Sequence, residues 1–181
     1  MAQQSAAWFH PAAPHTLVFR QYQRTMSSNP SSEFTVDGGC LCGRIRYRAT
    51  LSKDIGGAYT PICHCSLCRR ATGALLASYF WFPRENLAFL SPEENKPKHY
   101  ESSPGTQRGF CPECGTQLFM FSGHDEAHCG VTLGSLDDPN RLKPGQHIFW
   151  NHGIESMKEL LILDKQMPKY AEFSNEPPLD L

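Results

Sequence analysis

Seven of the eight cysteines in this chain lie in three short clusters. The clusters are Cys40-Leu41-Cys42, Cys63-His64-Cys65-Ser66-Leu67-Cys68 and Cys111-Pro112-Glu113-Cys114. Two or three thiols at such spacing cannot each reach a separate partner with the geometry of a disulfide, whereas a tetrahedral zinc ion accepts converging thiolates. The sequence therefore predicts zinc binding.

The number of ligands divides the clusters into two sites. The first and third clusters together supply four thiolates, which close one tetrahedral site and are typical of structural zinc. The middle cluster supplies three, which leaves its metal a position where chemistry can occur. We predict a structural zinc at Cys40, Cys42, Cys111 and Cys114, and a second zinc with a catalytic role at Cys63, Cys65 and Cys68.

Each site has an alternative interpretation. The outer clusters could form disulfides, but the chain shows neither an apolar leader nor a glycosylation motif that would indicate an oxidising compartment. The middle cluster could form a redox dithiol, or a fourth protein ligand could complete a second structural site. The candidate fourth ligands are His64, His124, His128 and Cys129. His64 is expected to point away from the metal, and Cys129 fits a buried free thiol better than a ligand.

Short strands and tight loops must position these sulfurs. Polar and apolar residues alternate over 44–49, which predicts a strand directly after Cys42. In an extended chain, two cysteines separated by a single residue point to the same side, so Cys40 and Cys42 can bind one ion. Pro112 and Gly115 suit a tight loop around a metal-bound sulfur.

Most of the remaining pattern predicts strands. Short segments rich in β-branched or aromatic residues and bounded by turn residues lie at 34–36, 45–51, 75–82, 98–101, 108–110, 117–121 and 128–133. A helical turn is predicted after the middle cluster with Ser66 as its N-cap, and 154–163 fits either a helix or a strand. We expect a mainly β fold of antiparallel sheets pinned by zinc, with little helix.

Composition indicates an ordinary globular domain. The 181 residues are 40% hydrophobic and carry a formal net charge of −1, which favours neither nucleic acid nor membrane as a partner. We expect a cytoplasmic protein with a domain at 33–170 and a flexible tail at 171–181. Residues 1–32 lack acidic side chains and are expected to be a flexible extension. The alternatives are that this segment is a mitochondrial transit peptide or that the protein begins at Met26.

Four motifs together resemble the glutathione-dependent formaldehyde-activating enzyme family, which also includes vertebrate centromere protein V. They lie at 38–47, 63–73, 108–116 and 134–139, in that order, and the resemblance covers about residues 34–170. It implies a tent-like fold of antiparallel sheets with a structural zinc at the outer clusters and an exchangeable zinc at the middle one. The activity that it implies is condensation of glutathione with formaldehyde to S-hydroxymethylglutathione, a carbon–sulfur lyase reaction.

The chemistry of a three-thiolate zinc fits that activity. A glutathione thiol with a pKa of about 8.5 is mostly protonated at neutral pH, and an open zinc position would bind it as thiolate beside an electrophile. A fourth thiolate gives the site an excess of negative charge, which nearby cations would offset. Arg69 and Arg70 are the candidates for binding the glutathione carboxylates, the alternative being ordinary surface arginines. No general base stands out.

A second class of function is compatible with the same residues. Both zinc ions could serve only to hold the fold of a non-catalytic binding module, or the protein could carry glutathione without turnover. The basic extension expected of a chromatin or cytoskeletal adaptor is missing, which favours the enzyme. The stripe of Arg44, Arg46 and Arg48 is predicted to be a solvated strand face rather than a binding surface for an acidic partner.

Overall fold

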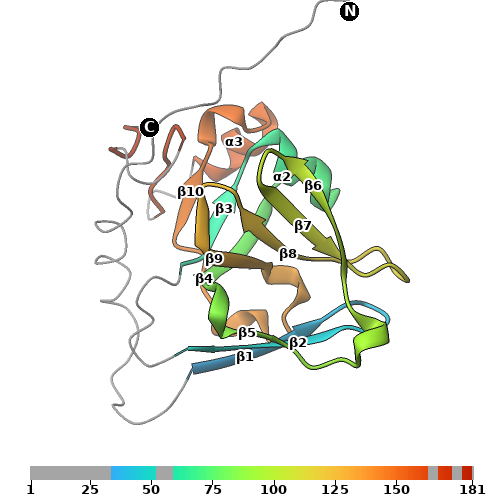
Figure 1. Cartoon of the computed structure of the whole chain (residues 1–181). Helices are drawn as coiled ribbons and strands as arrows, with labels where there is room; N and C mark the ends of the chain where they lie inside the picture. Colours follow the sequence, from blue (N-terminus) through green and yellow to red (C-terminus); the bar gives the residue numbers. More distant parts are fainter. Residues whose placement is uncertain (1–33, 52–58, 163–166, 173–176, 181) are drawn as a thin grey trace, which may run out of the picture.

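The computed structural model describes residues 34–51, 59–162, 167–172 and 177–180 (Figure 1). The extension predicted at 1–32 lies outside these residues. The described chain forms a three-stranded and a seven-stranded sheet, and the smaller sheet lies below the larger one in the view of Figure 1. This confirms the prediction of a mainly β fold.

The smaller sheet has the strand order β1-β2-β5, and both pairings are antiparallel. Its strands are β1 (Phe34–Gly39), β2 (Arg46–Leu51) and β5 (Leu87–Phe89). Side chains of β2 alternate as the sequence predicted, because Tyr47, Ala49 and Leu51 are buried in the core.

The arginine stripe lies on the solvated side of the chain around β2, as predicted. Three ion pairs within the chain engage it, joining Arg44 to Glu113, Arg46 to Asp137 and Arg48 to Asp37. The side chains of these pairs are substantially exposed, so each pair contributes little to stability.

The larger sheet has the strand order β10-β3-β4-β9-β8-β7-β6. Its pairings are antiparallel except that of β10 with β3, which is parallel. Its strands are β3 (Pro61–Cys63), β4 (Ala77–Pro83), β6 (Lys98–Ser103), β7 (Thr106–Phe110), β8 (Gln117–Ser122), β9 (Asp125–Thr132) and β10 (Gln146–Ile148).

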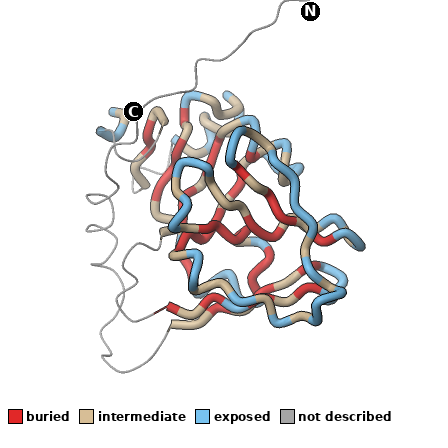
Figure 2. The backbone as a smooth tube through the Cα atoms, in the orientation of Figure 1, coloured by how far each residue is buried: buried red, intermediate tan, exposed pale blue. Residues whose placement is uncertain are grey.

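Strand β4 separates two hydrophobic cores. Because successive side chains of a strand point to opposite faces, Phe80 and Phe82 pack into a larger core shared with the smaller sheet, while Tyr79 and Trp81 pack into a smaller core on the other face. Figure 2 shows the buried backbone concentrated in the central strands of the larger sheet. The cysteine clusters divide between these two cores.

Helical structure is limited to short elements. The α-helices are α2 (Ser66–Thr72) and α3 (Glu155–Leu161). Single 3₁₀ turns are η1 (Arg84–Asn86), η2 (Glu93–Asn95), η3 (Leu133–Ser135), η4 (Pro139–Arg141) and η5 (Trp150–His152). The ambiguous segment at 154–163 therefore contains a helix.

The predicted strands are all present, with two kinds of correction. The strand expected at 75–82 begins at Ala77, and the strands β3, β5 and β10, which have three residues each, were not predicted. The N-cap of α2 is Cys65 rather than Ser66, because the Cys65 sulfur accepts a hydrogen bond from the Cys68 N–H at 3.3 Å. A cysteine at an N-cap is outside the usual preference, which explains the wrong prediction.

The described residues near the C-terminus pack along β10. The Tyr170 N–H donates to the His147 carbonyl, and the Phe149 N–H donates to the Glu172 carbonyl at 2.8 Å. Two residues of the predicted tail, Ala171 and Glu172, thus contact the domain through their carbonyls. No helix in the described part of the chain has both the length and the apolar character needed to cross a membrane.

Candidate metal centres

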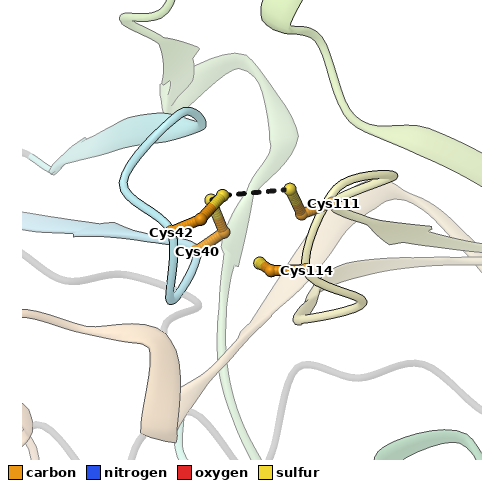
Figure 3. A group of neighbouring side chains, drawn as sticks. All are labelled: Cys40, Cys42, Cys111 and Cys114. Carbon is orange, nitrogen blue, oxygen red and sulfur yellow. Dashed lines mark hydrogen bonds between the residues drawn. The ribbon is translucent and has the colours of Figure 1, made fainter.

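The four-cysteine centre lies where two loops from different sheets meet (Figure 3). Cys40 and Cys42 belong to the turn between β1 and β2, and Cys111 and Cys114 belong to the loop between β7 and β8. The four sulfurs all lie within 4.8 Å of one another, with 3.4 Å between Cys40 and Cys42 and 3.8 Å between Cys42 and Cys111. Tetrahedral zinc with Zn–S bonds of about 2.3 Å places its sulfurs about 3.8 Å apart, so the residues fit the ion.

Backbone amides and glycines hold these loops in shape. The Ile45 N–H donates to the Cys40 sulfur at 3.3 Å, and the Gly115 N–H closes the second loop on the Cys111 carbonyl at 2.9 Å. Gly115 has a φ of 73°, a left-handed conformation that glycine adopts readily and that suits the predicted tight loop. Hydrogen bonds from the Thr116 hydroxyl and amide lower the pKa of Cys114 to about 5, which favours the thiolate that a metal requires.

Two cysteines of the four-cysteine centre are buried, whereas Cys42 is exposed and Cys114 is partly buried. Cys40 and Cys111 are members of the larger core, with exposed fractions of 6% and 0%. An ion held here would connect the smaller sheet to the larger one through side chains from both.

The three-cysteine centre belongs to the smaller core on the other face of β4. Cys63 ends β3, Cys65 caps α2, and Cys68 lies one turn into that helix. Cys65 and Cys68 are three residues apart at the start of a helix, so their side chains lie on the same face. The three sulfurs lie within 4.8 Å of one another. The structure thus brings together the three residues that the sequence assigned to the second metal.

None of the four candidate fourth ligands joins these sulfurs in the described residues. Cys129 is completely buried in the larger core, and His128 lies beside Asp125 with 3.0 Å between Nδ1 and the carboxylate. His64 instead hydrogen-bonds through Nε2 to His147 Nδ1 at 2.8 Å, a partner 83 positions away in the sequence. Burial lowers the pKa of His64 to about 4, so this ring is neutral at physiological pH.

A buried arginine beside the three-cysteine centre escaped the sequence analysis. Arg108 of β7 is 2% exposed, and its Nη2 donates to the Cys68 sulfur at 3.4 Å. Hydrogen bonds from Cys63 and Cys65 lower the pKa of Cys68, and the charge of Arg108 lowers it further. The same contacts among the cysteines raise the pKa of Cys63, so Cys68 is the thiol of this cluster that most readily becomes a thiolate.

The register of four strands brings Arg108 to this face. Trp81 lies opposite Gly130, Gly130 opposite Met120, and Met120 opposite Arg108. Directly paired residues share a face of the sheet, and Trp81 and Met120 both pack in the smaller core. A Cβ at position 130 would lie 2.9 Å from the Trp81 ring, so glycine makes room in this row. The sequence places Arg108 at the start of a predicted strand and of the motif at 108–116, and neither signal identifies the strands that pair beyond it.

Arg69 and Arg70, which the sequence proposed for substrate binding, follow Cys68 in α2 and differ in environment. Arg70 is exposed, whereas Arg69 is partly buried. The Arg69 Nε is buried and has no hydrogen-bond acceptor in the described part of the chain. A buried donor without a partner is costly, which indicates that Arg69 is the better placed of the two to receive a ligand.

Comparisons with known proteins agree with the resemblance seen in the sequence. The family model described as glutathione-dependent formaldehyde-activating enzyme matches residues 35–152. Proteins of Aspergillus flavus and Aspergillus oryzae that provisionally carry that name are each 31% identical over 100 residues, 51% of this chain and 51% of theirs. A Podospora anserina protein with the same provisional name is 32% identical over 100 residues, 51% of this chain and 46% of its own.

The chain spans about half the length of the curated relatives that it matches. A crystal structure of a Rhodobacter sphaeroides protein is 24% identical, with a TM-score of 0.46, and covers 58% of this chain and 93% of that one.

Proposed function

Because this chain belongs to the glutathione-dependent formaldehyde-activating enzyme family, we propose that it is a zinc-dependent enzyme of the carbon–sulfur lyase type. Its substrates would be glutathione or a similar thiol and formaldehyde or another small electrophile. The observation that carries this proposal is the separate cluster of Cys63, Cys65 and Cys68, which no further cysteine, histidine or carboxylate joins among the described residues.

The two clusters would hold two zinc ions, one structural and one catalytic. The four-cysteine set is complete and joins the two sheets, which supports a structural ion there. A zinc ion in the three-cysteine centre would supply a Lewis-acidic position at which a thiol loses its proton at neutral pH. Cys63, Cys65 and Cys68 would hold that ion and leave room for one sulfur from the substrate.

The reaction itself requires little of the protein beyond positioning. The glutathione sulfur forms a bond to the carbonyl carbon of formaldehyde, and the carbonyl oxygen takes up the proton that the thiol released. Holding both reactants in contact converts a bimolecular step into an intramolecular one, which is the main source of acceleration. The partner-free Nε of Arg69, with Arg70 beside it, supports a role for these arginines in binding a glutathione carboxylate.

The test measures the exchange between glutathione plus formaldehyde and their adduct by NMR, with catalytic amounts of zinc-loaded protein. We expect the wild-type protein to accelerate exchange and Cys65→Ser to abolish the acceleration while retaining the fold. Cys129→Ala is the matched control, because it removes a buried cysteine that lies in the other core. It should keep both the acceleration and two zinc ions.

The opposite result would point to the second class of function. If wild-type protein with two zinc ions leaves the exchange rate unchanged, the reaction with formaldehyde is excluded. Binding of glutathione without turnover would then leave a carrier or an enzyme with another electrophile, and absence of binding would leave another thiol or a module whose zinc ions are structural. A wild-type protein with a single zinc would contradict the role proposed for the three-cysteine centre.

A further inference from the structure

Arg108 is a buried cation with an unusual set of partners. Its Nε donates to Ser102 Oγ at 2.9 Å, its Nη1 to Tyr79 Oη at 3.0 Å, and its Nη2 to Cys68 Sγ at 3.4 Å. The guanidinium is thus fixed on three sides by residues of β6, β4 and α2. It lies 2% exposed in the interior of the larger sheet.

A buried guanidinium needs an anion nearby, because an arginine stays protonated even in the protein interior. In the described part of the chain no carboxylate lies within ion-pair distance of Arg108, whereas Arg44, Arg46 and Arg48 at the surface each have one. Ser102 and Tyr79 each offer Arg108 only a neutral hydroxyl. The Cys68 sulfur is therefore the partner that can carry the balancing negative charge.

Charge decides which fourth ligand a three-thiolate centre accepts. Three thiolates on a divalent ion leave one net negative charge, and a further thiolate would double it. The positive charge of Arg108 makes both net charges one unit less negative. The centre is then formally neutral before an anionic ligand enters and carries one negative charge afterwards. In a buried site of low dielectric constant, one unit of net charge changes the electrostatic energy far more than it does in water.

We propose that Arg108 is the resident counter-ion of the three-cysteine centre and makes it selective for an anionic fourth ligand, a thiolate, over water or a neutral donor. The inference rests on the proposed function, because it requires a metal at Cys63, Cys65 and Cys68. Arg108 acts through Cys68 and does not touch the substrate, so it is a positioning residue. Its effect falls on the sulfur of the thiol rather than on the carboxylates that Arg69 and Arg70 would bind.

Cobalt-substituted protein provides a direct readout, because thiolate-to-cobalt charge-transfer bands report each bound sulfur. The probe is 2-mercaptoethanol, which has no carboxylate and therefore isolates the charge at the metal from recognition of the rest of glutathione. It is titrated at fixed pH into the wild type, Arg108→Gln, Arg108→Lys and the control Arg48→Gln. Arg48 is a matched control because it forms an exposed ion pair with Asp37 in the smaller sheet, whereas the three cysteines of this centre belong to the larger sheet and α2.

We expect the wild-type protein to bind two cobalt ions and the thiol. Arg108→Gln should weaken thiol binding about tenfold or more, as loss of an outer partner of a metal ligand usually does. Arg108→Lys should recover most of that loss because it retains the charge, and Arg48→Gln should match the wild type. Equal thiol affinity in Arg108→Gln and the wild type, with both metals bound, would overturn the inference and leave the proposed function standing.

Two further outcomes also decide the question. Equal losses in Arg108→Lys and Arg108→Gln would show that the shape of the guanidinium matters rather than its charge, which overturns the inference. A wild-type protein that holds metal only at the four-cysteine centre would overturn the proposed function itself.

Should Arg108→Gln fail to fold, a second titration uses the unaltered protein. Azide supplies an anion and imidazole a neutral donor at the same centre. Azide that binds more tightly than imidazole supports the inference, and imidazole that binds as tightly as azide or more tightly contradicts it.

Discussion

The charges around Cys68 show how the chemistry of a metal centre depends on single residues. One sulfur of the cluster receives the hydrogen bond of a buried guanidinium, while another accepts the N–H of the helix that it caps. Outer partners of this kind fix the orientation of metal ligands and tune their basicity. The three cysteines of this centre are therefore chemically unequal before any metal binds.

Arg69 provides the prediction at the scale of a single substrate contact. Arg69→Ala should raise KM for glutathione about tenfold with little change in kcat, because a carboxylate contact is present in both the ground state and the transition state. Steady-state kinetics of the proposed reaction measure this. The control substrate is 2-mercaptoethanol, which lacks carboxylates and should show the same KM with both proteins. A KM for glutathione that does not change would remove Arg69 from the binding site.

Helix α2 illustrates how one element serves two purposes. Its first turn positions Cys65 and Cys68 for the metal, and the Cys65 sulfur caps the helix in the same place. The αL conformation of Gly73 ends the helix. The element that carries the ligands is thus held in place by one of those ligands.

Substitutions at Cys65 should separate these two purposes. Serine is a preferred N-cap, so Cys65→Ser should keep the stability of the metal-free protein within a few tenths of a kcal/mol, whereas Cys65→Ala should lose about 1 kcal/mol. Both should lose activity, because neither side chain is a thiolate ligand. Urea unfolding of the three proteins after metal removal measures the difference. Equal stability of the serine and alanine variants would show that the cap contributes nothing.

The histidine pair between β3 and β10 gives a pH dependence at the scale of an element. Burial lowers the pKa of His64 from 6.5 to about 4, so the unfolded chain binds this proton more readily than the folded one. The free energy of unfolding should therefore fall as the pH falls from 6.5 towards 4, by at most about 3 kcal/mol from this residue.

His64→Asn provides the control for this prediction, because it removes the titrating ring and keeps a polar side chain. Acid also releases metal from thiolates, so the relevant quantity is the difference between the two proteins at each pH. A difference that is constant from pH 6.5 to pH 4 would contradict a lowered pKa for His64.

At the scale of the whole molecule the two clusters lie in different cores, as the proposed division between a structural and a catalytic metal requires. The four-cysteine centre joins the two sheets at the edge of the larger core, and the three-cysteine centre lies in the smaller core. A metal that binds only the folded state contributes its binding free energy to stability. Loss of the first centre should therefore affect the whole domain.

Cys111→Ser tests this division. It should release one zinc and lower the free energy of unfolding by more than about 4 kcal/mol, because it removes a ligand that ties the two sheets together. Cys65→Ser should release the other zinc, lower the free energy of unfolding by less and leave the domain folded, because the three-cysteine centre lies within the smaller core and does not join the two sheets. Calorimetry with zinc analysis of each variant measures both quantities. Equal destabilisation by the two substitutions would contradict the separation of roles.

The sequence by itself determined the features that depend on neighbouring residues. Cys40 with Cys42, Cys65 with Cys68 and Cys111 with Cys114 are each within three positions, so local geometry suffices to predict that they converge. The longer strands were readable for the same reason, because alternation and turn residues are local signals. Three-residue strands such as β3 carry too short a pattern to be found.

Only the tertiary structure decided which distant residues share an environment. The alternation of β4 places the two centres in different cores, and the register from Trp81 through Met120 to Arg108 brings a buried cation to Cys68. Forty positions separate Cys68 from Arg108, and no periodic pattern links them. Strand pairing depends on the packing of the complete sheet, so the counter-ion of the candidate active centre could be found only after the chain was folded.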